Sequence, residues 1–300
     1  MSVSPVDIAI SCSDGVIIRG HLWRNSAGRR EGTVIVNPAT GVLARYYHHF
    51  ARFLAEQGFA AITYDYRGIG ASRPASLRNS GIRWRDWGEL DFEATIQWAL
   101  RNELDRPLNL VGHSIGGFLL GFAPSAVLLD RILTMGAQYA YFRDYAESRR
   151  ASMLFKWHFA MPILTALFGY FPGRRLGWLE DLPSGVANEW SFRRAAMELS
   201  YPPHEREALR GRFATLRTPI LAVGLTDDIF GTRAAIARAL RYYRGSDSCQ
   251  VEIRPSDLGF DSIGHFGLFH ERHRDGFWRS ALAWLRGGAN PWPHAEVPPR

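Results

Sequence analysis

A serine flanked by glycines is the group in the chain best placed for chemistry. Residues 112–116 read Gly-His-Ser-Ile-Gly, between an apolar run ending at Val111 and a second apolar run that begins at Phe118. A strand, a sharp turn and a helix form a nucleophile elbow, in which glycines two positions before and after the serine let the backbone pass close to itself. The pattern predicts that Ser114 is an exposed nucleophile for acyl transfer, with His113 as a packing residue.

A serine hydroxyl needs a neutral imidazole to accept its proton and a carboxylate to orient that imidazole. Among ten histidines, His265 has the most suitable surroundings, because it lies between two glycines in a loop after the last predicted strand. Asp227 and Asp228 follow the preceding predicted strand, which gives the chain order serine, acid, histidine. We expect Asp227, three residues beyond Gly224, to be the acid, with Asp228 as the alternate.

Acyl transfer also needs N–H donors aimed at the developing oxyanion. The N–H of Ile115, directly after the serine, is the first expected donor. Residues 37–41, Asn-Pro-Ala-Thr-Gly, take the place of a common His-Gly-x-x-Gly loop. Aligning the final glycines makes the Ala39 N–H the second expected donor, with Thr40 as the alternate, although the segment could also be a simple turn.

Eight short runs predict β-strands, and most are apolar throughout, which is typical of strands buried on both faces. They are Val6–Ser13, Val16–Trp23, Thr33–Asn37, Phe59–Tyr64, Leu108–Gly112, Arg131–Met135, Pro219–Gly224 and Cys249–Arg254. Helical patterns cover Ala44–Gln57, Trp87–Leu104, Thr232–Tyr243 and Asp275–Leu285. This alternation predicts a mostly parallel sheet, interrupted from 138 to 212 by a helical insertion. The Pro-rich tail, 288–300, is expected to be disordered.

Composition excludes several classes of protein. With 300 residues and 46% hydrophobic content, the chain has ample material for a folded core. The net charge of +7 comes from scattered arginines rather than from one basic element, which argues against a nucleic-acid binder. Cys12 and Cys249 match no metal-ligand or disulfide pattern, and the N-terminus has no signal-peptide pattern. We therefore expect a cytoplasmic protein with free thiols and no metal.

The most apolar stretch of the chain is Met153–Phe171. Lys156, His158 and Pro162 interrupt it and would be costly in a helix that spans a bilayer. A buried or lid helix pair is the expected structure, and its many aromatic residues are expected to form mainly its own core, with a few lining a pocket.

Five motifs together resemble the α/β-hydrolase superfamily, and in particular a group of bacterial predicted serine hydrolases. They are NPATGV from Asn37, DYRGIGAS from Asp65, GHSIGG from Gly112, DDIFGT from Asp227 and GHFG from Gly264. The resemblance implies an eight-stranded, mostly parallel sheet flanked by helices, a Ser-Asp-His triad, and a helical cap between strands six and seven. The core would then be 1–137 and 213–287, and the cap 138–212. In DYRGIGAS, Asp65 and Arg67 are expected to brace loops rather than to catalyse.

The leading hypothesis is a carboxylic-ester hydrolase that needs no cofactor and forms a covalent acyl-enzyme with a small, partly hydrophobic substrate. Peptidase and cofactor-free haloperoxidase activities are variants of it. One alternative is an acyltransferase with the same triad, in which an alcohol or thiol replaces water. Another is a non-catalytic ligand-binding protein, because fold alone does not fix function.

Overall fold

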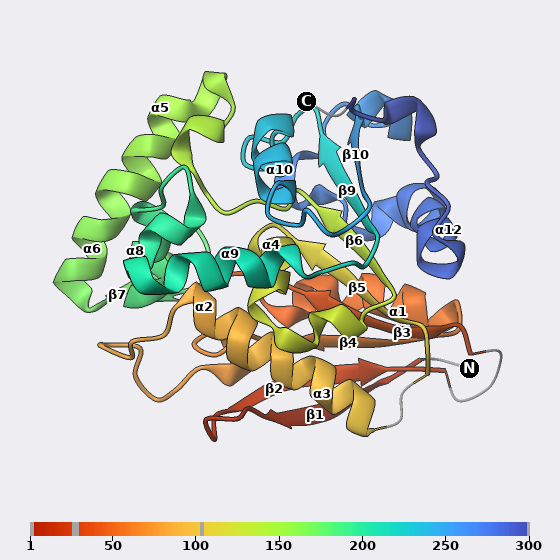
Figure 1. Cartoon of the computed structure of the whole chain (residues 1–300), viewed down its shortest axis with the longest axis horizontal. Helices are drawn as coiled ribbons and strands as arrows, with labels where there is room; N and C mark the ends of the chain where they lie inside the picture. The colour runs from red at the N-terminus through yellow and green to blue at the C-terminus, as the bar shows by residue number, and fades with distance from the viewer. Residues whose placement is uncertain (1–2, 26–29, 103–104, 299–300) are drawn as a thin grey trace.

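The computed structural model describes residues 3–25, 30–102 and 105–298. An eight-stranded sheet in the order β1-β2-β4-β3-β5-β6-β9-β10 forms its centre (Figure 1). The strands are β1 (Pro5–Ser11), β2 (Ile17–Trp23), β3 (Gly32–Asn37), β4 (Phe59–Tyr64), β5 (Leu108–His113), β6 (Arg131–Met135), β9 (Ile220–Leu225) and β10 (Ser248–Ile253). Strand β2 pairs antiparallel with β1 and β4, and the remaining pairs are parallel. The predicted fold class is confirmed.

The strands are buried because helices cover both faces of the sheet. Every residue of β3, β4, β5 and β9 is buried. Helices α1 (His48–Glu56) and α12 (Arg279–Gly287) contribute to the core on one face. Helices α3 (Glu93–Arg101), α9 (Arg206–Ala214) and α10 (Arg233–Leu240) contribute to the core on the other. Alternate strand residues supply the two cores, as Val34 and Ile35 show.

The other elements are short. They are α2 (Trp84–Asp86), α4 (Ile115–Phe118), α5 (Arg150–Met153), α6 (Met161–Phe168), β7 (Tyr170–Phe171), α7 (Gly173–Leu176), β8 (Leu182–Pro183), α8 (Ser184–Ser191) and α11 (Gly264–Gly267). A π-helical segment, Trp87–Phe92, joins α2 to α3, so the predicted helix Trp87–Leu104 begins earlier and runs to Arg101. Its expected last two residues, 103 and 104, lie outside the described residues.

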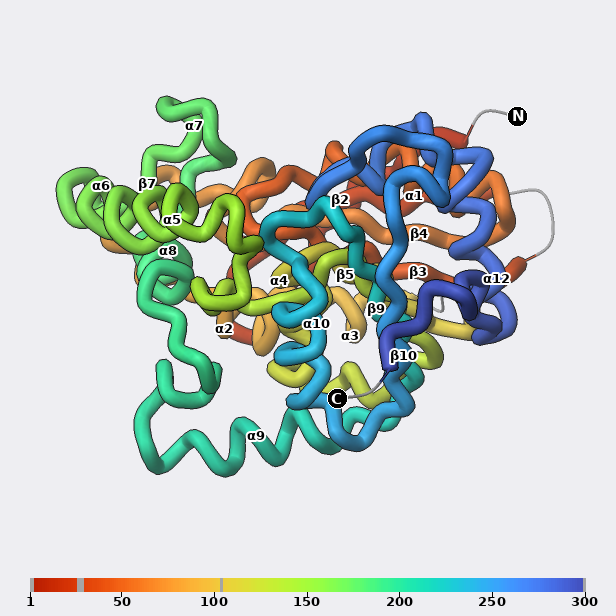
Figure 2. The backbone as a smooth tube through the Cα atoms, turned by 90° about the horizontal axis from the view of Figure 1, so that it is seen from above, coloured from red at the N-terminus to blue at the C-terminus, as the bar shows by residue number. Residues whose placement is uncertain are grey.

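Between β6 and β9 the chain leaves the sheet and forms a group of helices, residues 142–191, which we call the helical insertion. In Figures 1 and 2 its helices α5, α6 and α8 lie at one end of the molecule. One continuous helix, Glu147–Phe168, replaces the expected helix pair, and only a small part of it is buried. Helix α9 lies largely in the predicted cap range, but its Leu209 is part of the sheet core, and Phe213, just beyond that range, packs against Phe118 and Phe122.

Residues 288–298 of the tail that was expected to be disordered are anchored to the core, and residues 299 and 300 lie outside the described residues. Trp292 is buried and stacks on Phe277 of the core, with ring centroids 4.9 Å apart. Glu296 forms a β-bridge with Val251 of β10. The proline content indicated a loose tail, but one large aromatic side chain anchors it to the core.

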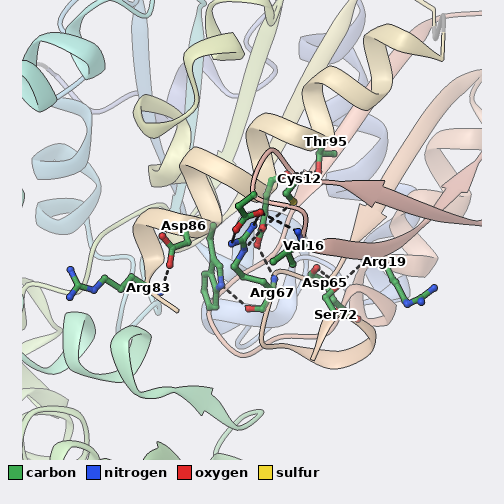
Figure 3. A network of polar contacts seen from close by, with 12 residues as sticks. Cys12, Val16, Arg19, Asp65, Arg67, Ser72, Arg83, Asp86 and Thr95 are labelled. Carbon is green, nitrogen blue, oxygen red and sulfur yellow. Dashed lines mark hydrogen bonds and ion pairs between the residues drawn. The ribbon is translucent and has the colours of Figure 1, made fainter. Parts of the chain in front are cut away.

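The DYRGIGAS turn braces loops as expected (Figure 3). The Asp65 carboxylate accepts hydrogen bonds from the N–H groups of Ala44 and Ala71, at 2.7 and 2.8 Å. The Arg67 guanidinium donates to Asp91 at 2.6 Å and to Asp14 at 2.6 Å. Because the Asp91 side chain is fully buried, Arg67 is the cation that compensates its charge.

Candidate active site

Ser114 lies in the turn between β5 and α4, at the carboxyl end of a central strand. Its backbone has φ 54° and ψ −124°, a strained conformation for a residue other than glycine. The neighbouring positions must be glycine because there is no room for a Cβ atom. A Cβ on Gly112 would lie 2.5 Å from the Cα of Gly117, and one on Gly116 would lie 2.5 Å from the carbonyl oxygen of Asn37. The strand, sharp turn and helix expected around Ser114 are therefore present.

The loop after β10 brings His265 to a carboxylate, and that carboxylate is Asp228. The His265 Nδ1 lies 2.7 Å from Asp228 Oδ2. Asp227, the acid expected from the sequence, instead accepts the N–H groups of Ile263 and Gly264, at 2.7 and 2.9 Å. The assignment of Asp227 as the partner of the imidazole was wrong. The two adjacent side chains therefore have different roles. Asp228 contacts the imidazole, and Asp227 holds the loop that carries His265.

The surroundings of Asp228 keep it ionised. Its Oδ1 accepts the N–H groups of Phe230 and Gly231, both at 2.8 Å. Burial alone would raise the pKa of Asp228, but the interaction with the His265 ring and these hydrogen bonds bring its pKa below the ordinary value. An ionised Asp228 accepts the Nδ1–H of His265, which leaves Nε2 as the proton acceptor.

Close packing fixes the position of this pair. A Cβ on Gly136 would lie 2.9 Å from Asp228 Oδ2 and 3.0 Å from the ring of His265. Gly136 also has a positive φ of 59°. A larger residue there would have to displace the carboxylate or the imidazole.

Gln138 is a further residue of the site, which the sequence marked only as the start of the expected insertion. Its side-chain Nε2 donates to Ser114 Oγ at 3.3 Å, and its side-chain oxygen, Oε1, accepts the N–H of Ala140. In this structure the partner of the Ser114 hydroxyl is therefore Gln138 rather than His265. Ala140 has a positive φ of 62°. No motif marked Gln138, because its place depends on this turn after β6.

His113 links three loops around the site. Its Nε2 lies 2.9 Å from the carbonyl oxygen of His265, so Nε2 carries the proton. Its Nδ1 then accepts the hydroxyl of Tyr47, at 2.8 Å. Burial lowers the pKa of His113 to about 3, which agrees with a neutral ring. The expectation of a packing residue was incomplete, because both ring nitrogens are hydrogen-bonded.

Tyr47 also changes the expected oxyanion donor. The Ala39 N–H donates to the Tyr47 hydroxyl at 2.9 Å and is therefore occupied. The prediction that the Ala39 N–H donates into the site was wrong, although Ala39 and the alternate, Thr40, both line the cavity together with Ser114 and Ile115. Within the described part of the chain the Thr40 N–H has no acceptor. Tyr47 is eight residues from Ala39, so the loop sequence alone did not reveal this contact.

These side chains open into a cavity of about 1130 Å³ between the core and the helical insertion. The polar wall contains Ser114, His265 and Gln138. The rest of the lining is mainly apolar and includes Met153, Trp157, Trp178 and Phe230, whose ring centroid lies 5.0 Å from that of His265. An apolar cavity with a few converging polar groups is typical of a small-molecule site.

Comparisons with known proteins agree with this architecture. Residues 34–294 match the model of the alpha/beta hydrolase family. A comparison with curated protein sequences gives no match.

Solved structures are similar over nearly the whole chain. The DcsB complex with its substrate analogue has 14% identity and a TM-score of 0.64, over 95% of this chain and 100% of that one. The alpha/beta hydrolase GrgF from Penicillium sp. sh18 has 17% identity and a TM-score of 0.63, over 94% and 98%. The Pyrococcus furiosus esterase PF2001 has 14% identity and a TM-score of 0.60, over 95% and 91%. Identities this low show a shared fold.

Proposed function

Since the chain belongs to the alpha/beta hydrolase family, we propose that it is a serine hydrolase that cleaves carboxylic esters through a covalent acyl-enzyme on Ser114. The observation that carries the proposal is the 2.7 Å contact between buried Asp228 and His265, which lines the same cavity as the serine in its strained elbow. Esterases among the similar structures are compatible with it.

In the proposed first half-reaction, His265 Nε2 takes the proton of the Ser114 hydroxyl as Oγ attacks the ester carbonyl carbon. The carbonyl oxygen becomes an oxyanion, held by the N–H groups of Ile115 and Thr40. When the intermediate collapses, the C–O bond to the alcohol breaks and His265 returns its proton to the departing oxygen. The acyl group then remains on Ser114.

In the second half-reaction a water molecule replaces the alcohol. His265 Nε2 takes a proton from water, whose oxygen attacks the acyl carbon, and then returns a proton to Ser114 Oγ as the acid leaves. Asp228 keeps Nδ1 protonated and stabilises the imidazolium in both halves. Gln138 holds the Ser114 hydroxyl in the resting state, and a shift of that hydroxyl to His265 begins the reaction.

The cavity favours a partly hydrophobic substrate. Its volume accommodates a medium-sized acyl or alcohol group, and Trp157, Trp178 and Phe230 provide apolar contact surface. In this proposal the helical insertion acts as a cap that sets the shape of the substrate.

Labelling with a fluorophosphonate, read by intact mass, tests the nucleophile. The wild type should gain one adduct, and Ser114→Ala and His265→Ala should gain none. Ser152→Ala is the matched control, because Ser152 lines the same cavity and should keep the adduct. A series of p-nitrophenyl esters of increasing acyl length then measures specificity. An adduct retained in Ser114→Ala, or no adduct on folded wild type, would contradict the proposal.

A further inference from the structure

The helical insertion carries a row of apolar side chains with no cover. Along the helix Glu147–Phe168, one row of residues spaced by four is buried: Met153, Trp157, Met161 and Thr165. A second row with the same spacing faces solvent: Phe155, Phe159, Ile163 and Leu167, which are 63%, 58%, 46% and 73% exposed. We call this second set the exposed row. The rings of Phe155 and Phe159 stack with centroids 5.6 Å apart.

The inner side of this helix is fixed to the protein. Trp157 stacks on Trp190 of α8 at 4.6 Å, and His158 is hydrogen-bonded to the carbonyl oxygen of Ser191 at 2.6 Å. In Figures 1 and 2 the helix lies at the edge of the molecule with α8 beside it. By length and composition it could cross a membrane, but these contacts hold it along the protein surface. Its exposed row is therefore available to an outside partner.

Basic side chains lie at both ends of the helix that carries the exposed row. From Tyr145 to Leu176 the chain has five basic residues and one acidic residue, Glu147. Arg149 lies at one end of the helix, and Arg175 lies over the ring of Phe168 at the other, 5.9 Å from its centroid. A second copy of this surface would bring basic ends against basic ends, in parallel or antiparallel pairing. An anionic surface fits both the charge and the apolar row.

We propose that the exposed row docks the protein on an anionic lipid bilayer, with the helix lying in the plane of the interface. The same helix contributes Met153, Lys156 and Trp157 to the wall of the Ser114 cavity. Docking therefore brings the cavity beside the lipid surface, from which an apolar ester can enter. The docking goes beyond the proposed hydrolase function and does not depend on it.

Vesicle flotation tests the docking with the full-length Ser114→Ala protein, in which hydrolysis plays no part. Phosphatidylcholine vesicles with and without phosphatidylserine are the probes. The protein should float with the anionic vesicles and detach as salt is raised. A Phe155→Ser/Phe159→Ser double variant should bind at least about tenfold more weakly. Arg175→Ser should weaken the preference for anionic vesicles.

Val127→Ser/Leu128→Ser is the matched control, because it removes two exposed apolar side chains near the amino end of β6, away from the cavity. It should float as the parent does, and circular dichroism checks the fold of each variant. Binding that is absent in the parent, or equal in row and control variants, would overturn the proposal. A dimer in analytical ultracentrifugation that only the row variant dissociates would also overturn it, in favour of a second copy.

Discussion

The sheet core and the helical insertion treat apolar side chains in opposite ways. Strands β3, β4, β5 and β9 bury every residue. The insertion helix buries one row and leaves a second, entirely apolar row in solvent. In the core, helices cover both faces of the sheet, so every apolar residue of those four strands is buried whichever face it points to. In the insertion, an apolar side chain is buried only where another element packs against it. Within the described residues, only one face of the insertion helix has such a neighbour.

The largest difference is expected where the core positions the proposed catalytic groups. Asp228→Asn should lower kcat/KM about 10⁴-fold, because an amide no longer holds His265 in the productive tautomer. Asp227→Asn is the adjacent control and should have a much smaller effect, since it changes only the support of the loop. Hydrolysis of a p-nitrophenyl ester measures both. A greater loss in Asp227→Asn would restore the assignment expected from the sequence.

The next largest effect is expected at the buried ion pair between Arg67, in the turn after β4, and Asp91, in the helical segment before α3. Arg67→Met should lower the free energy of unfolding by about 3–5 kcal/mol, because Asp91 is left buried without its cation. Arg254→Met breaks a pair with Asp257 at the surface and should change little. Urea unfolding compares the two. Equal losses would mean that burial of Asp91 is not what makes Arg67 important.

His113 makes the core sensitive to acid. Its pKa is lowered to about 3 by burial, so the unfolded chain binds a proton that the native protein refuses between pH 6.5 and 3. The contribution of neutral His113 to the free energy of unfolding is complete above pH 6.5. Below pH 6.5 it falls by about 1.4 kcal/mol per pH unit. Unfolding by urea at several pH values should show a shallower slope for His113→Gln. His204→Gln, at an exposed histidine, should keep the slope of the wild type.

The smallest effect is expected on the exposed row. Leu167→Ser should change the free energy of unfolding by no more than about 0.5 kcal/mol, because its side chain is already in water. Met161→Ala, on the buried row of the same helix, should cost about 2 kcal/mol or more. Thermal unfolding measures both variants. Similar losses would show that the exposed row is packed in solution, and would remove the contrast between the two regions.

The sequence predicted the strands well because buried parallel strands are short, continuous apolar runs with turn residues around them. Ser114 and His265 stood out because glycines at fixed spacing accompany them. The choice between Asp227 and Asp228 depended on the turn after β9, where neighbouring side chains point in different directions. The availability of the Ala39 N–H depended on Tyr47. Contacts of this kind arise only once separate segments meet.

The packed tail has a consequence for the free edge of the sheet. Strand β10 is the last in the order, and such an edge presents unpaired backbone groups to any strand that approaches. Glu296 forms a bridge with Val251, and the Val297 N–H donates to the carbonyl oxygen of Gln250 at 2.8 Å. The tail thus occupies part of the position that a strand from another chain would take, and it protects the protein against edge-to-edge aggregation.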